Sequence, residues 1–222
     1  MEPFKTFRGI AAPLDRANVD TDQIIAKQFL KSIKRTGFGE SLFNDWRYLP
    51  DGKPNPSFVL NDPKLKGATV LVARNNFGCG SSREHAVWSV AQYGFKAVIA
   101  PSMKNGDSIV PAFADIFRNN CSKNGLLTVE LKSEEVDHIF EAAKSAIVEI
   151  TLDLNAQKVT LHIPSHSAIF DKTQVAPEEK IFKFEIGSAI KERLLSGLDD
   201  IGTTLQEDAA ISVFEKSHQT WI

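Results

Sequence analysis

The amino-acid sequence predicts an α/β fold built on a partly parallel sheet. Apolar runs at 68–73, 95–100 and 126–131 are typical of buried strands. Stretches suited to helices lie between them, at 84–93 and 111–119. Because parallel strands need such crossovers, the alternation predicts a parallel core covered by helices.

The N-terminal part is predicted to start with a short strand at 6–13, followed by a loop at 15–25 that carries three acids. These acids are Asp15, Asp20 and Asp22. Closely spaced acids can bind a hard cation, but the glycine and glutamate of a calcium-binding EF-hand loop are missing downstream. Turn formation or helix capping is therefore the commoner role for such residues.

The next segment, 27–43, is basic and interrupted by glycines, which favours a solvated surface. Residues 42–56 contain Trp46, Tyr48 and three prolines, so we expect an irregular stretch whose aromatic side chains anchor it to the core.

The C-terminal half is predicted to contain a helix at 133–144 that is capped by Ser133. A hairpin is expected over 146–163, because apolar and polar residues alternate on both sides of a polar turn. A further strand at 181–186 precedes a helix at 188–196, which the following glycine ends.

Composition limits the function. The 222 residues are 42% hydrophobic and 24% charged, with a formal charge of −2, so nothing indicates nucleic acid or an anionic membrane as a partner. The N-terminus lacks the apolar core of a signal peptide and no run is long enough to span a membrane, which predicts a soluble, cytoplasmic protein.

The cysteine content limits the metal sites that this chain could form. Two cysteines, Cys79 and Cys121, cannot complete the ligand set of an iron–sulfur cluster or a structural zinc site.

The most informative stretch follows the first apolar run. Gly78 and Gly80 allow backbone conformations closed to other residues and leave room for a ligand close to the main chain. Ser81 and Ser82 precede a helix, whose free N–H groups and dipole would stabilise an anion or an alkoxide. Arg83 adds a forked cation that suits a carboxylate. The expected ligand is a small carboxylate or phosphate.

Other interpretations of this stretch remain. Serine is a common helix cap, and glycines before a helix often serve only close packing. A dinucleotide site is disfavoured, since Arg83 replaces the third small residue of the fingerprint and the strand at 95–100 lacks the following acid. The Gly-x-Ser-x-Gly motif of serine hydrolases is absent.

The heptapeptide Gly-Ser-Ser-Arg-Glu-His-Ala at 80–86 resembles the signature of the 3-isopropylmalate dehydratase small subunits. That family is similar to the C-terminal swivelling domain of the aconitases. Further blocks in the same order extend the resemblance along nearly the whole chain. They lie at 13–25, 27–30, 35–39, 42–47, 113–117, 197–202 and 204–206.

The resemblance implies roles for individual residues. Ser81 matches the catalytic base, and Asp22 would belong to the acid and hydrogen-bond relay. Ser82, Arg83 and Thr21 would bind substrate. These assignments involve no metal ligand in this chain.

Arg35 is the candidate for the substrate's second carboxylate, because arginine pairs with carboxylates in bidentate fashion. Glu84, His85 and Cys79 receive no role, and packing is the favoured interpretation of His85.

The same resemblance implies a fold and an activity. The fold would be a swivelling β/β/α domain covering 1–222, with insertions near 103–112 and 165–177. The activity would be a hydro-lyase of leucine biosynthesis that interconverts 2-isopropylmalate and 3-isopropylmalate. It would need a large subunit carrying a [4Fe-4S] cluster, in a heterodimer or heterotetramer.

Two alternatives stay open. One is the same chemistry on citraconate, citramalate or dimethylmaleate; the insertion at 103–112 would lie on the ligand-binding edge and leaves the substrate undecided. The other is a non-catalytic carboxylate-binding module.

Overall fold

The computed structural model describes residues 1–31, 34–167 and 174–218. Its centre is a seven-stranded mixed sheet of order β11-β8-β7-β1-β2-β3-β6. Strands β1, β2, β3 and β6 run parallel, whereas β7, β8 and β11 join through antiparallel pairings. The strands are β1 (Phe7–Pro13), β2 (Val70–Val72), β3 (Ala97–Pro101), β6 (Leu127–Leu131), β7 (Glu149–Asp153), β8 (Lys158–Ile163) and β11 (Glu178–Lys183). The predicted partly parallel α/β fold is confirmed.

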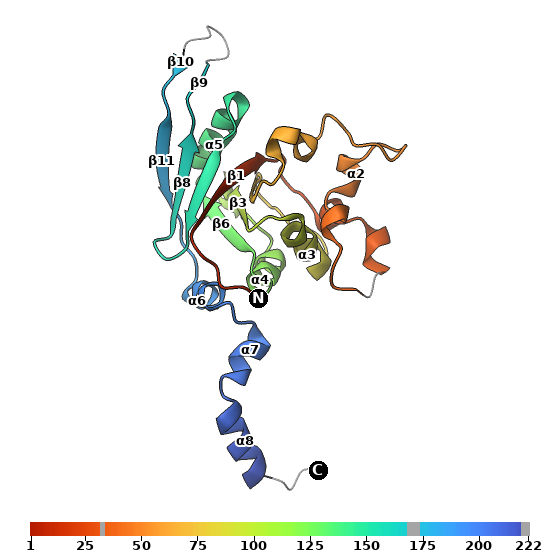
Figure 1. The fold of residues 1–222 in the computed structure, drawn as a ribbon, viewed down its shortest axis with the longest axis vertical. Helices are drawn as coiled ribbons and strands as arrows, with labels where there is room; N and C mark the ends of the chain where they lie inside the picture. The colour runs from red at the N-terminus through yellow and green to blue at the C-terminus, as the bar shows by residue number, and fades with distance from the viewer. Residues whose placement is uncertain (32–33, 168–173, 219–222) are drawn as a thin grey trace.

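Helices cover the sheet and form the last described part of the chain, up to Ser217 (Figure 1). The α-helices are α1 (Thr21–Ile24), α2 (Asn44–Arg47), α3 (Glu84–Tyr93), α4 (Asp115–Lys123), α5 (Ser133–Ser145), α6 (Ser188–Ser196), α7 (Asp200–Leu205) and α8 (Asp208–Ser217). Short 3-10 turns are η1 (Lys27–Lys31), η2 (Gly39–Ser41), η3 (Val59–Asn61) and η4 (Pro63–Leu65).

Each face of the sheet has its own core, because side chains alternate along a strand. In β2, Val70 and Val72 belong to one core together with α5 and the antiparallel strands. Leu71 belongs to the other, with α3, α4 and the aromatic residues of the N-terminal half. Trp46 packs against this second core and stacks on Phe43, with ring centroids 5.4 Å apart. Its predicted anchoring role is confirmed.

Several predicted element ends differ from the structure. Helix α4 begins at Asp115, because the preceding backbone bonds to the loop after β2: Phe77 N donates to Ala112 O at 2.9 Å. Helix α5 has Lys132 at its N-cap position. The prediction of Ser133 as cap is wrong, since its hydroxyl instead donates to Ser102 O at 3.2 Å.

Two further differences concern strands and loops. Strand β11 begins at Glu178 rather than 181, in register with β8 over its whole length. The loop expected at 15–25 contains helix α1, whose N-cap is Asp20. The Asp20 side chain accepts from Gln23 N at 2.7 Å. The commoner role of capping therefore applies to this acid.

Both suspected insertions contain paired strands. Residues 103–112 hold an antiparallel hairpin of β4 (Met103–Asn105) and β5 (Ser108–Val110). In 165–177, β9 (His166–Ser167) pairs with β10 (Gln174–Val175), and the residues between them lie outside the described part of the chain.

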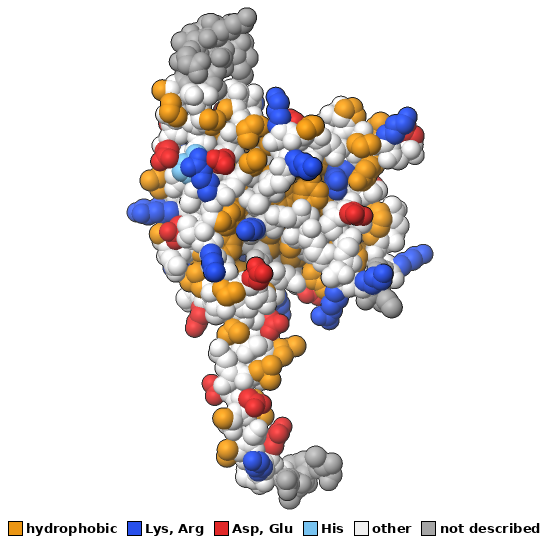
Figure 2. Space-filling view, in the orientation of Figure 1, with side chains coloured by type: hydrophobic (Ala, Val, Ile, Leu, Met, Phe, Trp, Pro, Cys, Tyr) orange, Lys and Arg blue, Asp and Glu red, His pale blue; other side chains and the backbone are white. Residues whose placement is uncertain are grey.

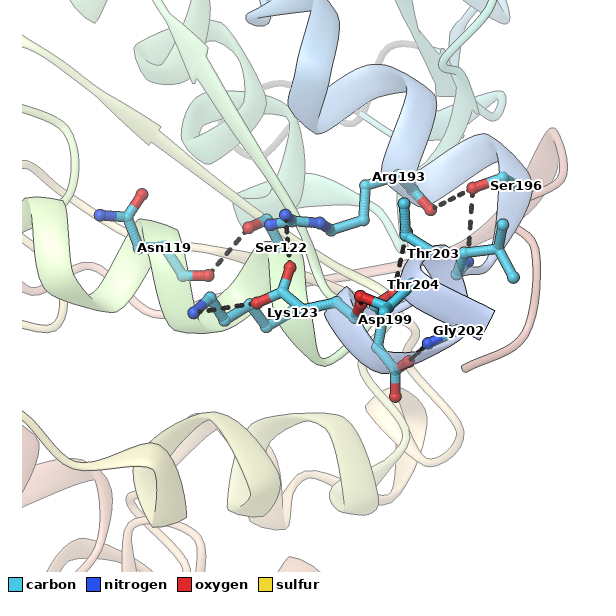
Figure 3. A network of polar contacts seen from close by, with 11 residues as sticks. Asn119, Ser122, Lys123, Arg193, Ser196, Asp199, Gly202, Thr203 and Thr204 are labelled. Carbon is cyan, nitrogen blue, oxygen red and sulfur yellow. Dashed lines mark hydrogen bonds and ion pairs between the residues drawn. The ribbon is translucent and has the colours of Figure 1, made fainter. Parts of the chain in front are cut away.

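Residues 198–217 form an arm that extends away from the sheet in Figure 1. Figure 3 shows the polar network at its base, where Lys123 of α4 and Arg193 of α6 lie close to α7. Both side chains pair with Asp200, Arg193 at 2.7 Å and Lys123 at 3.4 Å. Figure 2 shows hydrophobic and acidic side chains interspersed along the arm. In the ranges described, no helix is long and apolar enough to cross a membrane.

Candidate active site

Two loops meet at the carboxyl edge of the parallel strands. They follow β1 and β2, which are parallel neighbours and so end on the same side of the sheet. Backbone hydrogen bonds join the loops: Gly78 N donates to Val19 O at 2.7 Å, and Thr21 N donates to Cys79 O at 2.9 Å. This edge is the usual ligand-binding position of parallel sheets.

Thr21 connects the two loops through its side chain as well. Its hydroxyl donates to Ser81 O at 2.8 Å, and the residue is 2% exposed. Thr21 is the first residue of α1, whose start is fixed by the Asp20 cap. This contact holds the backbone that carries Ser81. The substrate-binding role that the sequence predicts for Thr21 stays a prediction.

Asp22 and Arg83, which lie 61 positions apart, form an ion pair across the two loops. Lys27 Nζ lies 3.8 Å from the other Asp22 oxygen. The hydrogen bond from Arg83 holds the pKa of Asp22 below its ordinary value, and the charge of Lys27 acts in the same direction. Asp22 is therefore ionised at neutral pH, which suits a hydrogen-bond acceptor better than a proton donor.

The glycine turn is needed for both its backbone conformation and its packing. Gly78 has a φ of 76°, and a Cβ there would lie 2.2 Å from Cγ of Phe117. Gly80 has a φ of 93°. Of the two roles that the sequence suggests for these glycines, close packing applies to Gly78. This packing sets the path of the chain into Ser81.

The two serines lie just before helix α3. The helix begins at Glu84 with Arg83 at its N-cap position, so neither serine is the cap. Ser81 and Ser82 are both exposed. Their hydroxyls are accessible at the edge where Arg83 supplies positive charge, which is the arrangement that a bound carboxylate needs.

Other highlighted residues lie elsewhere. Arg35 is exposed, its guanidinium carbon is 6.0 Å from the centre of the Trp88 ring, and its carbonyl accepts from Gln92 at 2.7 Å, near the end of α3. Its backbone is thus tied to the last turn of α3, whereas Arg83 lies at the N-terminal end of that helix. His85 packs edge-on against Phe38, with centroids 5.1 Å apart, as the packing interpretation predicts.

Lys27 was missed as a neighbour of the site. Its signal in the sequence is its position five residues after Asp22, which brings its amine near that carboxylate once helix α1 has formed. Sequence reasoning placed it in a basic cluster instead.

The two cysteines do not form a cluster site. Cys121 is fully buried in the core, whereas Cys79 is half-buried in the glycine turn. Within the described ranges, no group of three or more histidine, cysteine or acidic side chains could hold a metal ion. These residues do not fit an iron–sulfur cluster.

Comparison with known proteins shows to which family this chain belongs. Residues 1–134 match the family model of the aconitase C-terminal domain. The 3-isopropylmalate dehydratase small subunit of Desulforapulum autotrophicum is 48% identical over 225 aligned residues, covering 100% of this chain and 98% of the relative. The chain belongs to the family of 3-isopropylmalate dehydratase small subunits.

A solved member of the same fold supports the architecture. The crystal structure of 3-isopropylmalate dehydratase from Methanocaldococcus jannaschii superposes with a TM-score of 0.57 at 22% identity, covering 94% of this chain and 98% of that one. The family resemblance, the fold and the assignment to a small subunit of a hydro-lyase, all predicted from sequence, are confirmed. A small subunit implies a large subunit as partner.

Proposed function

We propose that this small subunit acts with a large subunit in leucine biosynthesis, interconverting 2-isopropylmalate and 3-isopropylmalate by dehydration and rehydration. The observation that carries the proposal is the meeting of Asp22, Ser81 and Arg83 at one loop edge in a chain 48% identical to a dehydratase small subunit. We infer that residues 1–222 act as one swivelling domain.

The reaction sets the roles. The proton removed is next to a carboxylate and weakly acidic, so the site needs a positioned base and positive charge for the resulting dianion. Ser81 is the proposed base: as an alkoxide it takes this proton, and the C–H electrons form the double bond as the hydroxyl leaves the neighbouring carbon. Rehydration adds water with the hydroxyl on the other carbon.

Substrate positioning falls to the neighbouring groups. A guanidinium has five donors, so Arg83 can bind a substrate carboxylate while one donor stays on Asp22. Ser82 would add a hydroxyl to the same carboxylate. Ionised Asp22 orients Arg83 and accepts hydrogen bonds. Arg35 would bind the second carboxylate of the substrate.

The leaving hydroxyl needs a Lewis acid, which we assign to a [4Fe-4S] cluster on the large subunit. The exposure of Ser81 and Ser82 supports such an arrangement, because a site that excludes water must be completed by another chain.

The test is Ser81→Ala, assayed in the complex with the native large subunit. Turnover should fall at least ~100-fold, the scale of lost acid–base catalysis, while assembly survives. Ser82→Ala is the matched control, since it should mainly raise KM. Normal turnover of Ser81→Ala would refute the assignment of the base.

The substrate is tested in the same complex. Isopropylmalate should be preferred over citramalate by kcat/KM. A preference for citramalate would keep the proposed chemistry and change the substrate. A complex that binds these acids without turnover would instead favour the interpretation as a non-catalytic carboxylate-binding module.

A further inference from the structure

Two asparagine side chains join the loops that meet at the carboxyl edge. Asn18 lies in the loop after β1 and Asn76 in the loop after β2, and Asn76 Nδ2 donates to Asn18 Oδ1 at 2.9 Å. Backbone bonds flank this contact: Asn18 N donates to Asn75 O at 2.9 Å, and Gly78 N donates to Val19 O at 2.7 Å. The Asn18–Asn76 pair therefore lies between the paired strands and the residues of the candidate site.

Both asparagines hold the backbone in the left-handed region. The φ angle is 55° at Asn18 and 59° at Asn76. Asparagine adopts this conformation more readily than most other non-glycine residues. Glycine would adopt it at no steric cost but could not form the bond between the loops. The two positions thus combine a backbone requirement with a side-chain contact.

The residues proposed for the chemistry follow the asparagines closely on both loops. Asp22 lies four residues after Asn18, and Ser81 lies five residues after Asn76. Between these points the loops are joined by the backbone and the hydroxyl of Thr21. Because both loops are short here and bonded to each other, a shift of one loop at its asparagine changes the distance between Asp22 and Ser81.

We propose that the Asn18–Asn76 pair positions Asp22 relative to the loop that carries Ser81. Both asparagines are positioning residues, since neither has a proposed contact with substrate. Their effect on turnover rests on the proposed function. The bond is exposed and therefore adds little to overall stability. Its effect on the rate is larger, because a displacement of about 1 Å caused by a residue outside the chemistry can lower a rate ~100-fold.

The first experiment measures kinetics in the complex with the native large subunit. Asn18→Gly keeps the backbone conformation accessible but removes the bond, and kcat should fall ~10–100-fold. KM should change less, because Ser82 and Arg83 lie on the same loop as Ser81 and keep their place relative to it. Asn18→Asp keeps an acceptor oxygen for Asn76 Nδ2, so its kcat should stay near the wild-type value.

The second experiment uses the full-length chain alone. The hydrogen bond from Arg83 holds the pKa of Asp22 below its ordinary value, so displacement of Asp22 should let this pKa rise. An NMR titration of the Asp22 carboxyl carbon measures it in Asn18→Gly and Asn76→Gly. Neither substitution changes a charge, and a purely structural role of the asparagines would not change this pKa.

Gln157→Gly is the matched control. Gln157 also has a left-handed backbone, with a φ of 52°, and its side chain donates to Phe184 O at 3.0 Å. It lies in the turn between β7 and β8, beside the start of β1, whereas the site follows the end of β1. Its substitution by glycine should leave both kcat and the pKa of Asp22 at their wild-type values.

The inference requires both changes in the glycine variants at 18 and 76. It is overturned by a wild-type kcat or a wild-type pKa of Asp22 in these variants, by an equal fall in kcat for Gln157→Gly, or by an Asn18→Asp variant as slow as Asn18→Gly. If the wild-type complex does not interconvert isopropylmalates, the proposed function fails. The Asp22 titration then decides on the asparagine pair by itself.

Discussion

Replacing Gly78 with alanine should destabilise the protein by about 2–5 kcal/mol. A non-glycine residue in the left-handed region costs roughly 1–2 kcal/mol, and Gly78 has a φ of 76°. The added Cβ would also lie 2.2 Å from Cγ of Phe117, and forcing an atom into a packed core costs about 1–3 kcal/mol. Phe117 cannot move aside easily, because it is 2% exposed and its ring packs edge-on against Phe77 at 5.3 Å.

Gly67→Ala separates the two costs. Gly67 has a φ of 81°, and nothing lies within 4 Å of an added Cβ. It should therefore lose only the roughly 1–2 kcal/mol of backbone strain. The entropic effect of alanine on the unfolded chain is common to both variants and cancels.

The assay is urea unfolding followed by circular dichroism, with the free energy of unfolding extrapolated to water. We expect Gly78→Ala to lose about 1–3 kcal/mol more than Gly67→Ala. In the Gly78→Ala background, Phe117→Leu should cost less than it does alone, since it makes room for the methyl group. Equal losses for the two glycine variants would refute the packing argument.

The remaining predictions concern titration. Because Arg83 lowers the pKa of Asp22 in the folded state, their pairing stabilises the protein above the unfolded pKa of about 3.9 and is lost as pH falls through the folded pKa. Asp22→Asn should therefore lower the Tm near neutral pH, and its difference from wild type should shrink in acid; parallel Tm curves would contradict this. Burial raises the pKa of both thiols, and the charge of Asp20 adds to this at Cys79. Both should react with a thiol reagent more slowly than in urea, with half-buried Cys79 ahead of Cys121; fast reaction of Cys121 in the native protein would count against its core position.

Residues close together in sequence were predicted well. Helix α3 has the bounds expected from its periodicity and final glycine, and β2, β3 and β6 lie within or beside their apolar runs. Local patterns succeed here because burial on a strand or helix face leaves a short periodic signature. The family could also be recognised, since its motifs are contiguous segments.

Contacts between residues far apart in the sequence determine several element ends that the local patterns did not predict. The start of α4 depends on the pairing of Phe77 with Phe113, and the cap of α5 on a contact of Ser133 with Ser102. No local pattern carries these pairings. The last two helices were not predicted, and the anchoring of α7 depends on Asp200 meeting side chains from α4 and α6.

The sequence alone determined the alternation of strands and helices, the glycine turn and the residue types that the chemistry requires. The pairing of Asp22 with Arg83, the hydrogen bond from Thr21 to the Ser81 backbone and the position of Arg35 beside Trp88 became known only from the folded chain. The reason is that β1 and β2 are neighbours in the sheet although 56 residues, 14–69, lie between them in the chain. The order of residues in the chain does not specify which strands pair. The parallel pairing of β1 with β2 brings the loops that follow them to one edge of the sheet, and this assembles the site.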